Sequence, residues 1–526
     1  MSLATLTDAL HAKLADVREM GGEAAVAKQH AAGKLTARER IDRFFDKDSF
    51  HELMPFAHHQ SDSPMMAGRK TPADGIVCGW GLVDGRKVAV IAYDFTVMAG
   101  TIGMIGEFKC SRLREIALRD KLPLVWFLDS AGARVQEAAT SMFAGSGAMF
   151  YDQVMMSGVV PQIAAMCGPC AAGTAYVPGL ADFVPMVKGT SSMALAGPPL
   201  VKAATGEDVT AEQLGGSRVH TRESGVGDLE VANDDALIAM CRDYLSYFPS
   251  HSGDKPPLIA CTDPVERADE ELLTVIPENP RSPMDMHKVI RCIVDDGKTL
   301  EIKPDWGKAI ICAFARIGGR PVGIVASNSK WMGGVLTNDP ADKAAKFIET
   351  CDAFSIPLVF LQDVPGFMVG MKTEKEGIIR HGAKMLFAVS RATVPKITVI
   401  VRKAYGAGYY VMCGKGYRPD VIVAWPGSEI SVMGPEGAVN IAFRKQIEAA
   451  GEGLEGDDKK KAMDDMRAML VQQFRDMITP YQPAAFTHID NIIDPRQTRK
   501  VIHDGLVMAE NKEVTLPPRR HAIMPV

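Results

Sequence analysis

The chain has 526 residues, of which 47% are hydrophobic and 23% charged, and this composition is that of a globular protein with room for two or more domains. Its 59 basic and 64 acidic side chains give a formal net charge of −5, so no basic excess favours a nucleic acid as partner. Ten cysteines in so long a chain form no dense disulfide framework, and we expect free thiols in a reducing compartment.

The N-terminal segment lacks the apolar run of a signal peptide and carries Asp8, Asp16 and Glu19, so a cytoplasmic location is expected. One stretch, Val159–Ala181, has no charged residue over 23 positions and is long enough to cross a bilayer. Its three prolines would break a helix exposed to lipid. The stretch therefore predicts a buried strand, a turn and a helix, and no association with a membrane.

In chain order, residues 1–45 are expected to form helices with charged faces, and Thr36 is the expected N-cap of the helix in Lys34–Asp46. The first half then predicts alternating elements: a hairpin over Ile76–Ala92, helices over Ile105–Asp120 and Ala148–Val160, and strands over Leu124–Leu128, Gln162–Cys167 and Ser192–Ala196.

The second half predicts the same order of elements. These are a hairpin over Ile310–Ser327, helices over Asp339–Ala353 and Gly377–Ala392, and strands over Leu358–Gln362, Ile397–Val401, Val421–Ala424 and Ile430–Val432, with a charged helical segment over 452–470. Strands that alternate with helices indicate an α/β protein.

Matching landmarks show that the two halves are related. Three pairs recur with the same separation of 234 positions: Gly85-Arg86 and Gly319-Arg320, Pro123-Leu124 and Pro357-Leu358, Val160-Pro161 and Val394-Pro395. So long a period indicates two domains that arose by internal duplication, and not a solenoid. We expect an N-terminal domain over residues 1–250, a proline-rich connection over 251–282 and a C-terminal domain over 283–526.

Each half has a buried strand that runs into small residues, in GPCAAGTAY (Gly168–Tyr176) and in KAYGAGYY (Lys403–Tyr410). A strand that passes through such a turn into a helix leaves backbone N–H groups pointing outward. These donors can stabilise an oxyanion as it forms, and the missing side chains let a thioester carbonyl come close. The sequence therefore predicts two oxyanion-binding turns, one in each domain.

Seven segments carry a resemblance to a known family: GKLTARERI (Gly33–Ile41), DSAGARVQE (Asp129–Glu137), GPCAAGTAYVP (Gly168–Pro178), LAGPPLVKAATGEDV (Leu195–Val209), DVPGFMVG (Asp363–Gly370), GIIRHGAKML (Gly377–Leu386) and AYGAGYYVMCG (Ala404–Gly414). With these segments the chain resembles, over nearly its whole length, the carboxyltransferase (β) subunit of biotin-dependent acyl-CoA carboxylases. The propionyl-CoA and methylcrotonyl-CoA carboxylases belong to this family. The resemblance implies two tandem crotonase-like (ββα-spiral) domains.

The resemblance also implies the activity. The chain would transfer a carboxyl group from carboxybiotin to the α-carbon, or the vinylogous γ-carbon, of an acyl-CoA. It implies that Ala172 and Gly173 hold the acyl-CoA enolate, and that Gly406, Ala407 and Gly408 hold biotin, with Ala407 and Gly408 as the second oxyanion pair. Family chemistry places no side chain as general base.

Three further residues are candidates for substrate binding. Tyr410 stands where propionyl-type relatives commonly have aspartate, so it is expected to shape the acyl pocket, with plain core packing as the alternative. Arg134 and Lys202 are candidates for the phosphates of CoA, and a structural or surface ion pair is the alternative for each. Features of both the propionyl and the methylcrotonyl type occur, so the acyl group stays open.

By the resemblance, biotin is carried by an α subunit that also holds the biotin carboxylase, and this chain forms a hexamer whose active sites lie at dimer interfaces. The chain contains no biotin-acceptor Ala-Met-Lys-Met sequence and no P-loop. The Cys167–Cys170 pair has redox or zinc-like spacing, yet no second cysteine pair matches it. The twelve histidines form no ligand cluster, so no metal is predicted.

Two other functions stay open. One is the α subunit of a sodium-pumping, biotin-dependent acyl-CoA decarboxylase, which uses the same chemistry in reverse. The other is a non-catalytic assembly subunit, for which the alanines in both turns are the only argument. A stand-alone crotonase-type hydratase is less favoured, because residues 164–180 contain no acid–base carboxylate.

Overall fold

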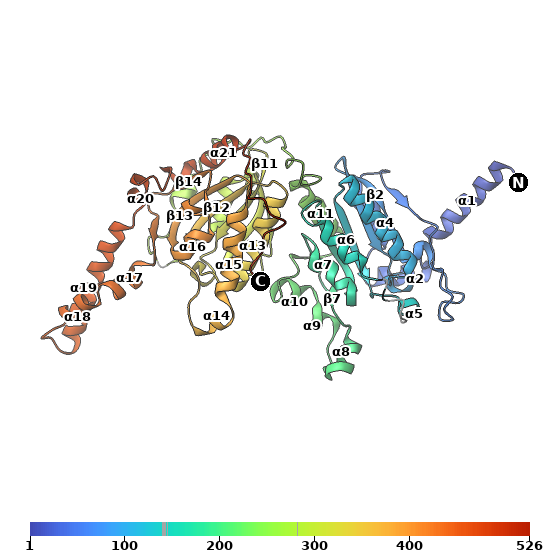
Figure 1. Cartoon of the computed structure of the whole chain (residues 1–526), viewed down its shortest axis with the longest axis horizontal. Helices are drawn as coiled ribbons and strands as arrows, with labels where there is room; N and C mark the ends of the chain where they lie inside the picture. The colour runs from blue at the N-terminus through green and yellow to red at the C-terminus, as the bar shows by residue number, and fades with distance from the viewer. Residues whose placement is uncertain (139–143, 145, 281) are drawn as a thin grey trace. The chain divides into compact units, whose positions relative to one another are not determined.

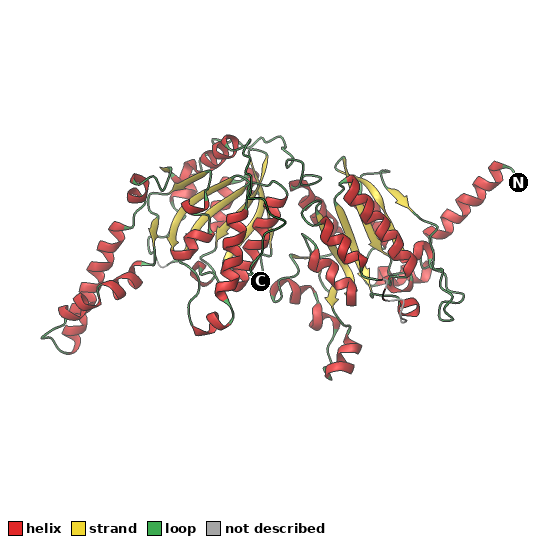
Figure 2. Ribbon diagram, in the orientation of Figure 1, coloured by secondary structure: helices red, strands yellow, loops and turns green. Residues whose placement is uncertain are grey.

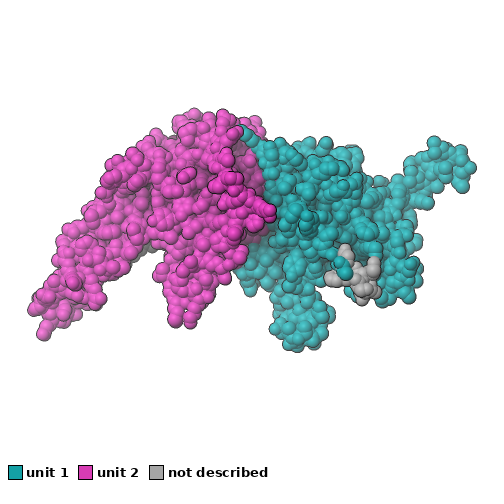
Figure 3. All heavy atoms as spheres, in the orientation of Figure 1, with its two compact units in different colours: residues 1–255 teal, residues 256–526 magenta. Residues whose placement is uncertain are grey.

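The computed structural model describes residues 1–138, 144, 146–280 and 282–526. The chain divides into two compact units, Met1–Lys255 and Pro256–Val526 (Figure 3). The division lies within the segment 251–282 that the sequence predicts as the connection. Each unit has its own sheet and its own hydrophobic core, and each is described by itself.

The sheet of the first unit is mixed. Its main path runs β1-β2-β3-β4-β5-β6-β8, and β7 pairs with the end of β5. The pairs β1–β2 and β2–β3 are antiparallel, and from β3 onwards the pairing is parallel. The strands are β1 (His51–Leu53), β2 (Ile76–Val83), β3 (Arg86–Tyr93), β4 (Leu124–Ser130), β5 (Gln162–Ala171), β6 (Pro185–Val187), β7 (Ser192–Ala194) and β8 (Leu229–Val231).

Helices cover both faces of this sheet (Figures 1 and 2). Apolar side chains of α4 and α6 pack on one face, and α3 and α11 pack against strands of the sheet as well. The helices are α1 (Leu3–Arg18), α2 (Glu23–Ala31), α3 (Ala37–Phe44), α4 (Met104–Asp120), α5 (Val135–Ala138), α6 (Ala148–Met156), α7 (Tyr176–Leu180), α8 (Pro198–Thr205), α9 (Ala211–Gly215), α10 (Ser217–Arg222) and α11 (Asp234–Tyr247).

The sheet of the second unit has the same plan. Its main path runs β16-β14-β13-β12-β11-β10-β9, and β15 pairs with the end of β13. The pairs β9–β10 and β10–β11 are antiparallel, and the later pairs are parallel. The strands are β9 (Thr299–Ile302), β10 (Ile310–Ile317), β11 (Arg320–Ser327), β12 (Leu358–Val364), β13 (Lys396–Tyr405), β14 (Val421–Ala424), β15 (Glu429–Ser431) and β16 (Asn491–Ile492).

In this unit α12 and α21 bury apolar side chains in the main core, while α13 and α15 pack against each other (Figure 1). The hairpin-like pair α17 and α19 has a small core of its own, centred on Val439, Ile447 and Leu470. The helices are α12 (Met286–Ile293), α13 (Asn338–Ala353), α14 (Met371–Lys375), α15 (Ile378–Arg391), α16 (Gly406–Val411), α17 (Pro435–Ala442), α18 (Arg444–Ala450), α19 (Gly456–Met477), α20 (Tyr481–Ala485) and α21 (Thr498–Met508).

The four strands β2 to β5 and their counterparts β10 to β13 have identical lengths and begin 234 positions apart. The two sheets also share their order of pairing. This agreement confirms the predicted α/β architecture and the internal duplication.

Two strands are longer than the sequence predicts. The strands β5 and β13 extend to Ala171 and Tyr405, although the apolar runs end at Cys167 and Val401. Their last residues stay in the sheet because β7 and β15 pair with them after the main path has ended. The buried residues near the end of β13 include the charged Arg402, and hydropathy alone does not place an arginine in a buried strand.

A buried lysine occupies the same place in both units. The ammonium group of Lys109, on α4, donates hydrogen bonds to the carbonyls of Ala73 and Ile76, at 2.8 and 2.5 Å. Its counterpart Lys343, on α13, donates to the carbonyls of Lys303, Trp306 and Ile310, at 2.8, 3.2 and 2.9 Å. Each lysine thereby fixes the segment that leads into the first long strand of its sheet.

All ten cysteines are free thiols, and only Cys261 is not buried. Among the helices that the structure describes, none combines the length and the apolar character needed to cross a bilayer.

We predict that Lys343→Met lowers the free energy of unfolding by about 2 kcal/mol, because three buried carbonyls lose their donor. Lys346→Met is the matched control, since Lys346 is exposed on the same helix. Urea denaturation followed by circular dichroism measures both changes. Equal stability of the two variants would contradict a structural role for the Lys343 ammonium group.

Candidate active site

The two predicted turns begin with the same backbone conformation. In the first unit β5 ends at Ala171, and a short 3₁₀ turn, Ala172–Ala175, leads into α7. In the second unit β13 ends at Tyr405 and α16 follows directly. The first residue of each turn is left-handed, with φ of 57° at Ala172 and 55° at Gly406. Glycine adopts this conformation freely, whereas alanine is strained in it.

Each turn presents backbone donors at an accessible position. The first N–H groups of a helical segment have no acceptor within the helix. Ala172 and Gly173 are exposed in the first turn, and in the second turn Ala407 is exposed and Gly406 half-exposed. Two adjacent N–H groups on accessible, small residues can bind a carbonyl oxygen that gains negative charge.

The separation of 234 positions pairs Ala172 with Gly406 and Gly173 with Ala407. The pair predicted from the sequence, Ala407 and Gly408, lies one position later in the chain than these matched residues. Gly408 is the counterpart of Thr174, and both are buried. The matched pair in the second turn is therefore Gly406 and Ala407, and the roles of all these residues stay predictions.

Gly408 has a packing role of its own. A Cβ atom added to it would lie 2.7 Å from a methyl carbon of Val364 and 3.2 Å from the Cα of Gly366. Its missing side chain lets α16 approach the end of β12. Gly173 differs, because a Cβ there would meet only Phe150, at 3.6 Å.

A second loop lies against each turn, and the sequence analysis did not assign it to the site. A Cβ on Gly132, in the loop after β4, would lie 2.8 Å from the carbonyl oxygen of Ala171. Its counterpart Gly366, after β12, has its nearest such neighbour in the carbonyl of Tyr405, at 3.9 Å. Both glycines have positive φ. The sequence already relates these two loops, because DSAG and DVPG are separated by the same 234 positions as the other matched landmarks.

The loop of the first unit is anchored by a buried carboxylate, Asp129, at the end of β4. Lys34 binds one of its oxygens at 2.6 Å, and Arg40 binds the other at 3.0 Å. Gln29 also donates to it, at 2.9 Å. Gly168 makes room for this contact, because a Cβ there would lie 1.9 Å from an Asp129 oxygen. The segment GKLTARERI thus supplies the cations that neutralise Asp129.

In the second unit a different side chain neutralises the matching buried carboxylate. Asp363 is the counterpart of Asp129 and is also buried. Arg402 binds it with two parallel hydrogen bonds, of 2.9 and 2.7 Å. Arg402 stands 234 positions after Gly168, so a side chain on β13 takes the space that Lys34 enters in the first unit. The sequence analysis did not anticipate either ion pair.

Arg134 is fully buried and already engaged. Its guanidinium group contacts Asp74 at 2.6 Å and Glu137 at 2.9 Å, and it donates to the carbonyl of Thr101 at 3.0 Å. This placement favours the structural ion pair over a contact with CoA phosphates. Through these bonds Arg134 holds the loop that contains Gly132.

The other two candidates are accessible. Lys202 lies on α8 with 60% of its side chain exposed, and it contacts Asp208 at 2.9 Å. Tyr410 lies on α16 and is 51% exposed. Its ring lies 6.0 Å from that of Tyr409 and 6.3 Å from that of Tyr417, measured between centroids. Half of Tyr410 thus remains free to contact a ligand, which a plain core residue could not do.

The Cys167–Cys170 pair lies inside β5, and both thiols are buried. Burial raises the pKa of Cys170 to about 12, so this thiol is neutral at physiological pH and a poor nucleophile or ligand. Within the described ranges no group of three or more histidine, cysteine, aspartate or glutamate side chains is placed to hold a metal ion.

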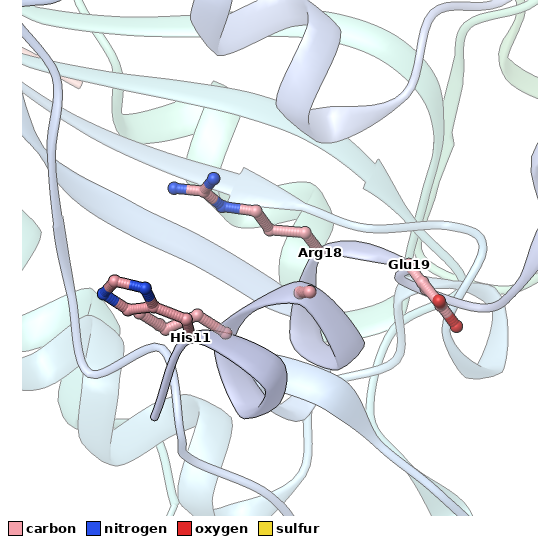
Figure 4. Close-up of a pocket in the computed structure, with 5 residues that line it drawn as sticks. His11, Arg18 and Glu19 are labelled. Atoms are coloured by element: carbon pink, nitrogen blue, oxygen red, sulfur yellow. The ribbon is translucent and has the colours of Figure 1, made fainter. Parts of the chain in front are cut away.

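A pocket on the N-terminal helix lies apart from both turns in the sequence. It is lined by His11, Leu14, Ala15, Arg18 and Glu19. Figure 4 shows Arg18 and Glu19 pointing in different directions from the end of α1. None of the predicted site residues lines this pocket.

The chain is similar to known proteins over nearly its whole length. A family model described as carboxyl transferase domain matches residues 28–524. The chain is 44% identical to the methylmalonyl-CoA decarboxylase subunit alpha of Veillonella parvula, over 98% of each chain. It is 41% identical to the propionyl-CoA carboxylase carboxyltransferase subunit of Haloferax mediterranei, over 100% of both.

The structure is also similar to a solved one. It matches a transcarboxylase 12S crystal structure with a TM-score of 0.94 and 41% identity, over 100% of this chain and 99% of that one. That structure is described as a hexamer assembly with methylmalonyl-coenzyme A and methylmalonic acid bound.

We predict that Gly408→Ala destabilises the protein by about 2 kcal/mol, because the added methyl group overlaps Val364 and forces α16 outward. Gly173→Ala, in the other turn, should change stability by less than about 0.5 kcal/mol, since its Cβ has room. Thermal unfolding measured by calorimetry compares the two. A larger loss for Gly173→Ala would refute the packing described for these turns.

We predict that Arg40→Met costs about 3 kcal/mol of unfolding free energy, because it leaves the buried charges of Asp129 and Asp234 partly uncompensated. Arg43→Met on the same helix should cost less than about 1 kcal/mol, since Arg43 pairs with Asp235 at the surface. Chemical denaturation of both variants gives the difference. Similar costs would mean that the buried network does not stabilise the first unit.

Proposed function

The chain belongs to the carboxyl transferase family, and from this premise we propose that it transfers a carboxyl group between carboxybiotin and the α-carbon of a propionyl-CoA-like substrate. It is a biotin-dependent acyl-CoA carboxyltransferase with the tandem crotonase-like fold that the sequence predicts. The identity of the acyl group, the direction of carboxyl transfer and the partner subunit are proposals that rest on the site.

The observation that carries the proposal is the pair of matching turns. Carboxyl transfer between two carbonyl compounds builds negative charge on two oxygens, first on one partner and then on the other. Each unit supplies one turn with adjacent backbone donors, beginning at Ala172 and at Gly406. Two preorganised sets of donors suit one reaction with two oxyanions.

In the first unit, the N–H groups at Ala172 and Gly173 would hold the thioester oxygen of the acyl-CoA. Hydrogen bonds to this oxygen strengthen as the α-carbon loses its proton and the enolate forms. The exposed, small residues leave the approach to these donors open. The same bonds fix the position of the α-carbon relative to the incoming carboxyl group.

In the second unit, the backbone at Gly406 and Ala407 fits a flat ureido ring, because neither residue places more than a methyl group beside the donors. When bound, biotin supplies the carboxyl group and accepts the substrate proton, as the family chemistry implies. The donors at this turn would hold the ureido oxygen. Gly408 keeps α16 against β12 and so keeps the donors in place.

Two side chains complete the proposed acyl-CoA site. Lys202 is exposed on α8 and can reach a phosphate of CoA as a mobile cation. Tyr410 presents half of its ring beside the second turn, and it would border the acyl pocket of a second copy of the chain in the proposed hexamer. Arg134 acts indirectly, by holding the loop around Gly132.

We assign the substrate to the propionyl and methylmalonyl class. The chain is 44% and 41% identical over nearly its whole length to proteins named for methylmalonyl-CoA and propionyl-CoA. We propose a hexamer, by analogy with the transcarboxylase 12S assembly. We also propose a separate partner that carries biotin and the biotin carboxylase.

A second candidate is the decarboxylase direction. The 44% identity to a methylmalonyl-CoA decarboxylase subunit alpha favours it, since the same two turns serve transfer in either direction. A non-catalytic assembly subunit fits less well. Both turns keep the backbone donors that a non-catalytic chain would not need to retain.

The test is the reverse half-reaction of the purified chain. We expect methylmalonyl-CoA to be converted to propionyl-CoA only when biocytin is added. Mass spectrometry of the CoA esters measures this conversion. Malonyl-CoA and 3-methylglutaconyl-CoA, tested in parallel, define the acyl class.

Ala407→Pro, which removes one N–H near the start of α16, should slow the reaction by about 10²- to 10³-fold. Ala407→Gly keeps the N–H and is the control.

Absence of biocytin-dependent turnover with all three esters, in a folded oligomer, would reject the proposed activity. Equal rates for Ala407→Pro and Ala407→Gly would reject the role of the second turn. To separate carboxylase from decarboxylase, the chain is combined with the proposed biotin-carrying partner. Carboxylation that requires ATP supports the first candidate, and decarboxylation that requires sodium supports the second.

A further inference from the structure

Both turns are followed by a tyrosine at the same position. Tyr176 lies 234 positions before Tyr410, and the two side chains are 52% and 51% exposed. Tyr176 follows Ala172 by four residues and Gly173 by three. Tyr176 is the first residue of α7 and directly follows the 3₁₀ turn Ala172–Ala175.

An aromatic pair lies beside the first turn. The ring of Phe150 packs edge-to-face on Tyr176, with centroids 5.7 Å apart and planes at 82°. A Cβ atom built on Gly173 would have Phe150 as its nearest neighbour, at 3.6 Å. The residue 234 positions after Phe150 is Lys384, whose ammonium group contacts Asp342 at 3.1 Å. A charged side chain thus occupies the matching position of the second unit.

The aromatic pair is held in place by buried hydrogen bonds. Gln153, one turn after Phe150 on α6, donates to the carbonyl of Val177 at 2.8 Å. Gln162, at the start of β5, donates to the carbonyl of Gln153 at 3.2 Å. The first bond joins α6 to α7 and the second joins β5 to α6, so buried contacts connect the two helices that carry Phe150 and Tyr176.

We propose that Tyr176 and Phe150 form the wall of the acyl subsite and that Tyr176 limits the length of the acyl group to a short, apolar chain. This inference rests on the proposed role of Ala172 and Gly173 as donors to the thioester oxygen. An oxygen bound there places the acyl chain within a few bonds of the turn. The apolar rings then accept carbon substituents and exclude polar ones.

The experiment compares chain lengths. Biocytin-dependent decarboxylation is measured for malonyl-, methylmalonyl- and ethylmalonyl-CoA with the full chain and with Tyr176→Ala, Tyr176→Trp and Tyr151→Ala. Tyr151 is the matched control, because it lies on α6 with 68% of its side chain exposed and is not part of the wall. The quantity compared is the ratio of kcat/KM between two esters.

Tyr176→Ala should raise the ratio of ethylmalonyl- to methylmalonyl-CoA by about tenfold, the usual value of one methylene group in an apolar pocket. Tyr176→Trp should shift the preference in the opposite direction, towards malonyl-CoA. Tyr151→Ala should leave both ratios unchanged. If both Tyr176 variants keep the ratios of the parent chain, Tyr176 does not limit the acyl group.

Binding measurements separate this inference from the proposed activity. Calorimetric titration with propionyl-CoA, hexanoyl-CoA and CoA itself requires no catalysis. We expect Tyr176→Ala to improve the affinity for hexanoyl-CoA relative to propionyl-CoA about tenfold, with CoA unaffected. Unchanged relative affinities would overturn the inference even if the carboxyl transfer proceeds, and a shift would support it even if that transfer fails.

Discussion

Each unit buries one carboxylate near the carboxyl end of a central strand, Asp129 on β4 and Asp363 on β12. The loop beside each turn depends on how this negative charge is neutralised. A buried carboxylate without a partner costs several kcal/mol, so its counter-ion is a condition for the fold. Asp129 takes Lys34 and Arg40 from the N-terminal segment, whereas Asp363 takes Arg402 from the neighbouring strand. The glycine loops that follow these carboxylates then lie against the two turns. The electrostatic anchor and the donor geometry are therefore parts of one arrangement.

Duplication gave the protein two copies of one turn, and the residues around the two copies differ. Ala172 and Gly406 share a positive φ, Gly173 and Ala407 are both exposed, and both turns follow a central strand. The matched residues nearby differ: Phe150 packs on Tyr176 in the first unit, whereas Lys384, 234 positions after Phe150, pairs with Asp342 in the second. A reaction that moves charge from one carbonyl to another needs the shared part, and recognition of two unlike partners needs the divergent part. The exposure of Tyr410 adds a ring at the second turn.

The periodic parts of the fold could be predicted from the sequence. Apolar alternation gave the hairpins and the central strands, and the separation of 234 positions gave the duplication. The ends of β5 and β13 could not be predicted, because their last residues stay in the sheet through pairing with β7 and β15. The two small-residue turns were visible as motifs, and the separation of 234 positions already matches Gly408 to Thr174. The burial of these two residues and the positive φ of Ala172 and Gly406 could not be predicted. The partners of Asp129, 89 and 95 residues away, leave no local signal.

The two anchors also differ in how much chain they enclose. Arg402 and Asp363 are 39 residues apart, within one strand–helix–strand segment. Lys34 and Asp129 are 95 residues apart, and Arg40 reaches Asp234 across 194 residues, from the third helix of the unit to its last. The anchor of the first unit thus spans that unit from end to end, while the anchor of the second unit lies in its middle. The second unit has its own long-range ion pair, because Arg499 on α21 contacts Asp295 across 204 residues. Closing a longer loop costs more conformational entropy, so the Arg402–Asp363 pair can form before the contacts that reach the last helix of each unit.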